Sequence, residues 1–234
     1  MTRFAIGNSA KKFTIQTDTL LAKVPSFVKE VKPEIMTTSN SLTAKNDNDN
    51  LRGPFVYKDF EEFSFQLFVG WIEGEALRGP TDFHTLHHYL GLYAIAHKFQ
   101  LEGLKNQTMD LVRRYYREQN MTAPPFRLEF IYSRTTGANP MRRFLATTAA
   151  YRALCGDQNA ENSEGGITEQ MKKLLVKGGD IVADYIEALL WLIKGSTADE
   201  YQDVRRGDDC VWHEHETTKK CEPAPAPEPY DESA

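Results

Sequence analysis

The hydrophobic positions between residues 60 and 116 follow a helical period in three successive segments. Apolar residues recur there at intervals of three and four, which is typical of helices with one buried face. The pattern predicts helices over 60–73, 85–98 and 101–117, with Gly74 ending the first. The expected buried face of that first helix consists of Phe60, Phe63, Leu67, Phe68, Trp71 and Ile72. Because aromatic side chains dominate the energetics of cores, we expect Trp71 to anchor this face.

Before these helices, the pattern changes to the alternation that is typical of strands. Residues 3–7 and 12–16 alternate apolar and polar side chains around a Gly-Asn-Ser turn, and residues 55–57 form a third short apolar run. A helical period over 18–31 lies between them, and Pro33 ends it. Residues 34–54 are polar and carry no period, so we expect a mobile surface segment. The predicted fold class is therefore α+β and mainly helical, with a small sheet.

Further helices are expected after residue 118. Pro124-Pro125 opens one helix, and Asn139 followed by Pro140 is a capping sequence for another over 141–154. The last helices are expected within 167–194. Their apolar stripe is predicted to consist of Val182, Tyr185, Ile186, Leu189, Leu190 and Ile193.

The organisation predicted from these patterns is a unit over 3–118, a helical extension over 119–195 and an acidic, proline-rich tail over 196–234. The chain has a net charge of −5. Residues 198–234 hold eleven acidic and four basic residues, or −7, so the remaining residues total about +2. Neither part is the basic surface of a nucleic-acid-binding protein. Lacking apolar period, the tail is expected to be disordered.

The composition also argues against a membrane or secreted protein. The chain contains no apolar run of about 18 residues and no hydrophobic leader at its start. Three cysteines in 234 residues do not make a disulfide framework. The expectation is an intracellular protein, cytoplasmic or nuclear.

Four residues of the tail form a candidate metal-ligand set. Cys210, His213, His215 and Cys221 follow the pattern Cys-x2-His-x-His-x5-Cys. Thiolates and imidazoles are the ligands that zinc takes in tetrahedral sites, although this spacing is not that of a zinc finger. Two interpretations stay open: a zinc site, or a disordered acidic tail that happens to contain these residues.

Other candidate chemistry is sparse. His84, His87, His88 and His97 fall on one predicted helix without a nearby cysteine or acidic cluster, and they are interpreted as surface and groove histidines. No nucleophile elbow, P-loop, dinucleotide-binding turn or His-Glu-x-x-His motif is present. We therefore expect a protein that is not an enzyme and that requires no cofactor.

The order of these elements resembles the BTB/POZ domain, and the fungal members most closely. The resemblance is carried by residues 13–16, 68–74 and 96–99, and by the central stretch YLGLYAIAHKFQLEGLKN. It covers about residues 3–118. It extends more weakly to 131–135, to 140–145 and to the Cys-Val-Trp-His-Glu-His segment of the tail.

The resemblance implies a small sheet with helical hairpins and a role as a protein–protein interaction module, a scaffold or adaptor. The working surfaces would be the exposed face of the 86–116 helices and the groove with 124–154. The alternative is a substrate adaptor of a cullin-type ubiquitin ligase. At the cullin-contacting position the sequence reads His88-Tyr89-Leu90, which lacks the usual carboxylate, and His88 and Tyr89 are the candidate partner-binding residues.

The start of the chain bears on dimerisation. Long-form BTB dimers use a helix before the first strand, and the first strand here is expected near residue 3. A swapped dimer of that kind is therefore disfavoured, while homodimerisation through another face stays open.

Overall fold

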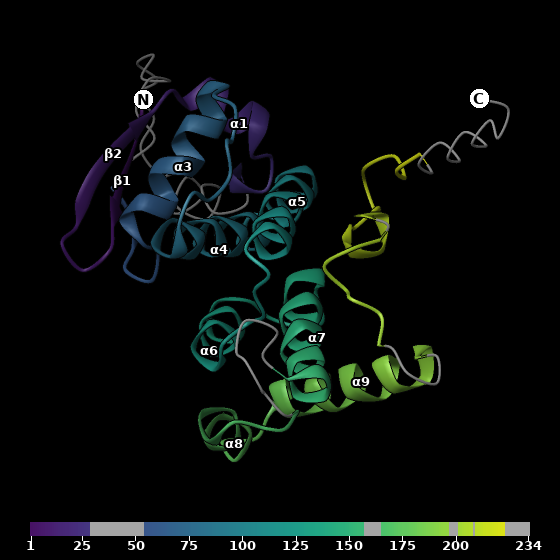
Figure 1. Cartoon of the computed structure of the whole chain (residues 1–234). Helices are drawn as coiled ribbons and strands as arrows, with labels where there is room; N and C mark the ends of the chain where they lie inside the picture. The colour runs from purple at the N-terminus through teal and green to yellow at the C-terminus, as the bar shows by residue number, and fades with distance from the viewer. Residues whose placement is uncertain (29–53, 157–164, 197–200, 208, 223–234) are drawn as a thin grey trace, which may run out of the picture.

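The chain folds as an α+β protein that is mainly helical (Figure 1). The structure is a computed structural model that describes residues 1–28, 54–156, 165–196, 201–207 and 209–222. Most of the predicted mobile segment (34–54) and the proline-rich end of the tail (223–234) lie outside the described residues.

The sheet has three strands in the order β2-β1-β3. β1 (Thr2–Ile6) pairs with β2 (Lys11–Ile15) as an antiparallel hairpin, and with β3 (Phe55–Tyr57) in parallel. Gly7 adopts a φ of 70° in the hairpin turn, a conformation that glycine reaches without strain. The three predicted strands are confirmed to within one residue at each end.

The first group of helices packs against this sheet and comprises α1 (Thr17–Lys23), α3 (Glu62–Glu73), α4 (Phe83–Lys98) and α5 (Glu102–Glu118). The helix predicted over 18–31 is interrupted: α1 ends at Lys23, residues 27–28 are helical again, and residues 29–31 lie outside the described residues. Pro25 explains the early end, since a proline disfavours helical backbone in the residue before it. α4 starts at a complete capping box, in which the Asp82 carboxylate accepts from the backbone N–H groups of His84 and Thr85.

The predicted buried face of α3 is confirmed in part, because Phe68 and Ile72 are buried, but its centre is displaced. The buried residues of this helix are Ser64, Phe65, Phe68 and Ile72, whereas Phe63 is 57% exposed. Trp71 lies at the margin of the core, where its indole N–H donates to Gln107 and the Lys23 ammonium lies over its ring. The expectation that Trp71 is the central anchor is therefore corrected, and Phe65 and Phe68 take that place.

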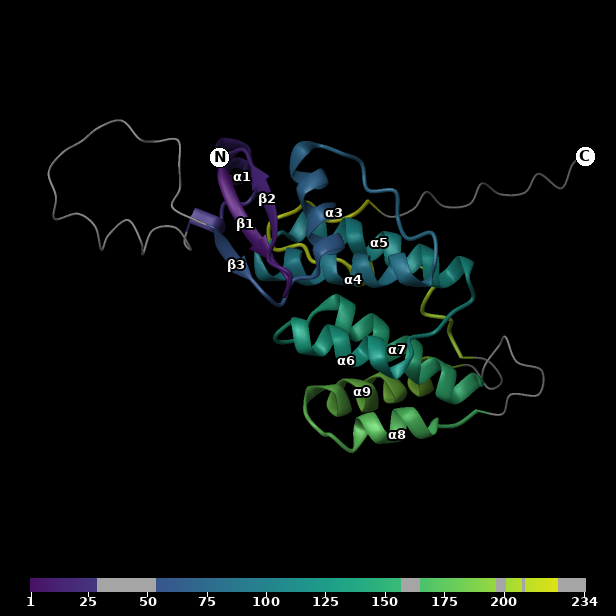
Figure 2. The same ribbon diagram turned by 90° about the vertical axis from the view of Figure 1, so that its left-hand side faces the viewer.

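A second group of helices lies beside the first (Figure 2). It comprises α6 (Pro125–Arg134), α7 (Pro140–Cys155), α8 (Glu169–Leu175) and α9 (Asp180–Gly195). The predicted cap of α7 is confirmed, because the Asn139 side chain accepts from the backbone N–H of Arg142 at 3.1 Å. α7 is buried along most of its length and forms the centre of this group.

The predicted apolar stripe of α9 is also corrected. The residues that α9 buries are Ile181, Tyr185, Ala188 and Leu192. Ile186, Leu190, Trp191 and Ile193 are instead about half exposed. α9 is thus apolar on its outer side as well, but no helix among the described residues is long and apolar enough to cross a membrane.

The tail departs most from expectation. Residues 201–207 and 209–222, predicted to be disordered, pack against the helices and contain a 3-10 helix, η1 (Asp209–Trp212). Val204, Arg205 and Trp212 are each less than 5% exposed. In both views the yellow tail segment runs along α5 (Figures 1 and 2).

Candidate functional site

One short 3-10 helix directs the tail onto the helical body. Trp212, its last residue, meets the ring of Phe144 edge-on with centroids 5.4 Å apart. The guanidinium groups of Arg113 and Arg143 lie over the same indole, at 5.9 and 4.9 Å from its centroid. A buried tryptophan contacted by two cations is a strong local anchor, because burial and cation–π attraction add. η1 therefore has a fixed place between α5 and α7.

α5 holds the residues that follow η1 through a row of polar side chains. Asn106 donates to the backbone carbonyl of Glu214 at 2.8 Å and accepts from its N–H at 3.0 Å, as an adjacent strand would. Lys105 forms an ion pair with the Glu214 carboxylate. These contacts fix the backbone between the two histidines of the tail.

Glu102, in the first turn of α5, holds the next part of the tail. Its carboxylate accepts from the backbone N–H groups of Glu216, Thr217 and Thr218 at 3.0, 2.9 and 2.8 Å, and from both threonine hydroxyls. Burial alone would raise the pKa of Glu102. The hydrogen bonds from Thr218 and Thr217 outweigh it and lower the pKa to about 2. Glu102 is thus a fixed anion around which the tail turns.

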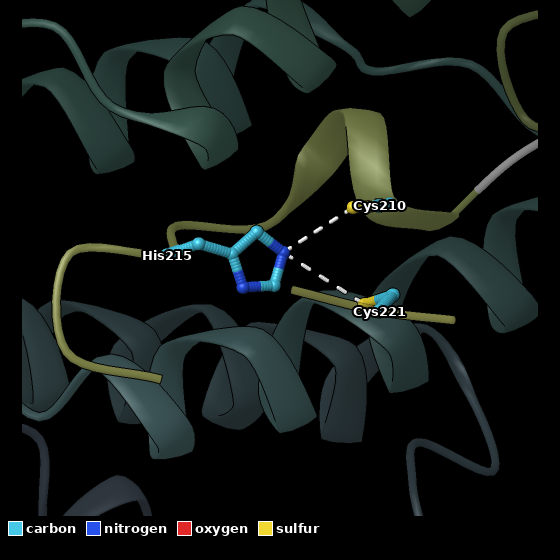
Figure 3. Close-up of side chains that lie close together, drawn as sticks. All are labelled: Cys210, His215 and Cys221. Atoms are coloured by element: carbon cyan, nitrogen blue, oxygen red, sulfur yellow. Dashed lines mark hydrogen bonds between the residues drawn. The ribbon is translucent and has the colours of Figure 1, made fainter. Parts of the chain in front are cut away.

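The turn brings two cysteines and one histidine of the predicted metal set together. The ligand atoms of Cys210, His215 and Cys221 all lie within 4.8 Å of one another. Figure 3 shows Nε2 of His215 facing both sulfurs, at 3.3 Å from Sγ of Cys210 and 3.8 Å from Sγ of Cys221. Among the described residues no second group of three such ligands is present.

The fourth predicted ligand, His213, lies at the edge of this group. Its Nδ1 is 3.1 Å from Sγ of Cys221, while it stands outside the set of atoms that are all within 4.8 Å. A hydrogen bond of 3.1 Å from the His213 N–H to the Cys210 carbonyl closes the turn between the two residues. Only 8% of the His213 side chain is exposed. Two thiols and two imidazoles therefore lie close together beside the first half of α5, a donor set that can fill the tetrahedral shell of zinc.

The proposed partner residues of α4 are placed differently. Tyr89 is only 5% exposed, and its hydroxyl accepts from the backbone N–H of Gly79 at 2.8 Å. Tyr89 is therefore buried and its hydroxyl is engaged within the chain, so its side chain is not part of the exposed surface of α4. His88 is partly exposed and pairs with the Glu61 carboxylate at 2.7 Å. Of the two candidate residues, only His88 exposes part of its ring to a partner protein.

Of the other histidines of α4, His84 is exposed, whereas His87 and His97 are partly buried. The ring of His87 packs on Phe130 with centroids 4.2 Å apart, and Nε2 of His97 accepts from the backbone N–H of Thr136. Burial lowers the pKa of both imidazoles. Both are links between α4 and the segment at α6.

A second surface feature adjoins the Cys/His group. A groove of about 610 Å³ lies between α7, α9 and η1. Arg143, Trp191, Val211 and His213 contribute to its walls, together with the acidic residues Asp184 and Glu187. Trp191 is 48% exposed, and the half-exposed residues of α9 continue the apolar surface beyond the groove. The tail thus forms one wall of a groove whose other side includes Asp184, Glu187, Ala188 and Trp191 of α9.

Sequence reasoning missed the residues that hold the tail. Glu102, Asn106 and Asp110 recur every four residues on α5, a pattern that is typical of a solvated helix face. The sequence does not show whether such a polar helix face is solvated or binds a segment that follows more than a hundred residues later in the chain. The Cys/His set itself was visible because its members lie within twelve positions.

Comparison with known proteins gives no relative: no protein-family model, no curated protein and no solved structure matches this chain.

Proposed function

We propose that this protein is a non-enzymatic protein–protein interaction module, a scaffold or adaptor of BTB/POZ-like architecture. The small three-stranded sheet packed on helical pairs, followed by a helical extension, is the arrangement that the sequence resemblance implies. The observation that carries the proposal is the outer face of α9. Ile186, Leu190 and Ile193 form one apolar stripe that is about half exposed, and Trp191, exposed to the same extent, lies on the side of α9 that faces the groove.

Such a face is costly to leave in water and is typical of a binding surface. Exposed apolar side chains that gather in one patch mark interaction sites, whereas scattered ones do not. Ile186, Leu190 and Ile193 follow the i, i+4, i+7 spacing of one helix stripe. Trp191, beside the groove, is of the residue type most often found at the energetic centre of interfaces.

The groove indicates the chemistry of the partner. Its α9 wall combines the Trp191 ring with the carboxylates of Asp184 and Glu187, while the guanidinium of Arg143 is engaged with Trp212 and the Val211 carbonyl. A partner segment with apolar side chains flanked by basic residues fits this arrangement, because the two carboxylates would attract its cations. The stretch His88-Tyr89-Leu90 adds no support for a cullin adaptor, since Tyr89 and Leu90 are buried.

The test compares proteins retained by the full chain with those retained by a Leu190→Lys, Trp191→Lys variant. Val176→Lys is the matched control, because Val176 is 88% exposed and lies outside α9. We expect specific partners to be retained by the wild type and the control, and to be lost with the double variant. Purified partner should then bind the wild type at least about 10-fold more tightly, since truncated interface hot spots cost about 2 kcal/mol or more.

Two results would contradict this assignment. Equal retention by all three proteins would show that α9 is not the binding surface. Retention of a cullin that depends on His88 and not on α9 would favour the ligase-adaptor alternative. Light scattering of the same samples identifies a second copy of the chain as the occupant if only the double variant loses a dimer.

A further inference from the structure

We propose that Cys210, His213, His215 and Cys221 bind a zinc ion that fastens the C-terminal segment to α5. Four electron-pair donors from a twelve-residue segment converge at one place, although the segment has no helix or strand after Trp212 to bring them there. Sulfur and imidazole nitrogen are the donors that zinc prefers. The assignment does not depend on the identity of any partner.

Three of the six distances between the donors are close to the edges of a zinc tetrahedron. Bonds of about 2.3 Å to sulfur and 2.0–2.1 Å to nitrogen place a nitrogen and a sulfur about 3.6 Å apart at tetrahedral angles. The three nitrogen–sulfur separations here are 3.3 Å for Cys210–His215, 3.8 Å for Cys221–His215 and 3.1 Å for Cys221–His213. Their mean lies close to the expected edge. A movement of His213 into the group formed by the other three donors would complete the fourth corner.

The far side of each imidazole is held by a group that fixes its tautomer. Nε2 of His213 lies 2.7 Å from a carboxylate oxygen of Asp110, and a carboxylate accepts. The proton of His213 is therefore on Nε2, and the lone pair is on Nδ1, which faces Cys221. A carboxylate behind a ligating histidine is the usual outer partner in zinc sites.

The same reasoning applies to His215. Its Nδ1 lies 3.3 Å from the hydroxyl oxygen of Thr218, whose own proton goes to Glu102. The hydroxyl must then accept from Nδ1–H, which leaves the lone pair on Nε2, between the two sulfurs. Both histidines thus present an unprotonated nitrogen to Cys221, and both are braced by α5, one directly and one through Thr218.

The geometry favours a metal over a disulfide between Cys210 and Cys221. Nε2 of His215 is directed at both sulfurs. A disulfide has no thiol proton and binds no cation, so it would leave the lone pair of this nitrogen without a partner. A cation satisfies all four donors together. Zinc would then fix the wall of the groove that His213 and Val211 help to form. A closed set of four protein ligands is typical of a structural site rather than a catalytic one.

The test uses the untagged full chain with three measurements on the same samples. Elemental analysis counts zinc, cobalt(II) substitution reports thiolate ligation and tetrahedral geometry through its absorption bands, and alkylation reports free thiols. We expect one zinc per chain, intense thiolate–cobalt bands and protected Cys210 and Cys221. The Cys210→Ser, Cys221→Ser variant should lose all three signals. Cys155→Ser is the matched control and should keep them, because Cys155 belongs to α7.

The bracing residues provide an independent test. Asp110→Asn should weaken zinc binding about 10–100-fold, which is the usual effect of removing an outer partner of a ligand. His213→Asn should weaken it further and change the cobalt spectrum, whereas His84→Asn, on α4, should change neither. Absence of zinc from the wild type with both thiols reactive would overturn the proposal, and so would a Cys210–Cys221 disulfide in the mass spectrum. Unchanged affinity in His213→Asn would overturn the four-ligand assignment.

Discussion

Glu102 shows how one side chain can organise a segment that has almost no core of its own. The residue is 7% exposed, and its two oxygens accept from three consecutive backbone N–H groups of the tail. Hydrogen bonds to a charged group contribute more than neutral ones, about 1.5–3 kcal/mol each. The same carboxylate orients Thr218, which in turn orients His215.

Glu102→Gln should therefore loosen the tail without unfolding the helices. The glutamine side chain keeps one oxygen as an acceptor, but its N–H₂ group would face the backbone N–H donors of the tail. We therefore expect tail docking to weaken by about 1–3 kcal/mol. Hydrogen exchange of the amides at 216–218 measures this directly. Glu118→Gln, an exposed position at the far end of α5, is the matched control and should leave the exchange unchanged.

The pH dependence of this contact follows from the pKa of Glu102. Its folded-state value of about 2 lies below the ordinary 4.5, so the carboxylate stabilises the docked tail fully above about pH 4.5. That contribution is lost as the pH falls towards 2. The difference between the wild type and Glu102→Gln should shrink over the same interval. A difference that stays constant down to pH 2 would show that the charge of Glu102 does not hold the tail.

At the scale of elements, alternation and helical period were sufficient to predict the strands and most helices, but not the phase of every helix. α3 carries Phe63, Phe65, Phe68 and Trp71, so apolar side chains surround much of it and more than one face fits the period. Packing decides the matter: Phe65 contacts Phe4 and Phe13 of the hairpin, which places Phe63 outside. α9 is ambiguous for the same reason, and there the surplus of apolar residues remains at the surface.

The corrected phase of α3 leads to a comparison of two aromatic residues. Phe68 is 1% exposed, so Phe68→Ala should lower the free energy of unfolding by about 3–5 kcal/mol. Trp71→Ala should cost less than about 2 kcal/mol, because much of its ring already meets solvent or polar groups. Urea denaturation of both variants measures the two values. The opposite order would restore the original face, with Trp71 at its centre.

At the scale of the whole molecule, the tail changes the organisation that the sequence indicated. The sequence after residue 195 has no hydrophobic periodicity, and for that reason it was predicted to be disordered. Hydrophobic periodicity, however, indicates only helices and strands, and an irregular segment can be ordered without it. The tail packs through single side chains that use surfaces made by distant helices: Trp212 on Phe144, and Arg205 on the carbonyl of Met121. No local signal encodes such contacts. The division into 3–118, 119–195 and a tail describes the order of elements, whereas the tail contacts α5 in the first group and α7 in the second.

The central claim is that zinc holds residues 209–222 in this docked position, and hydrogen exchange of the untagged full chain with and without a chelator tests it most directly. Metal binding and local folding are coupled at such sites, so removal of zinc should release the tail. We expect amides of 213–221 to exchange slowly in the zinc-loaded protein and rapidly after chelation, while α4, α5 and α7 keep their protection. Slow exchange in both samples would show that protein contacts alone dock the tail, and rapid exchange in both would show that it is not docked; either result would contradict the account.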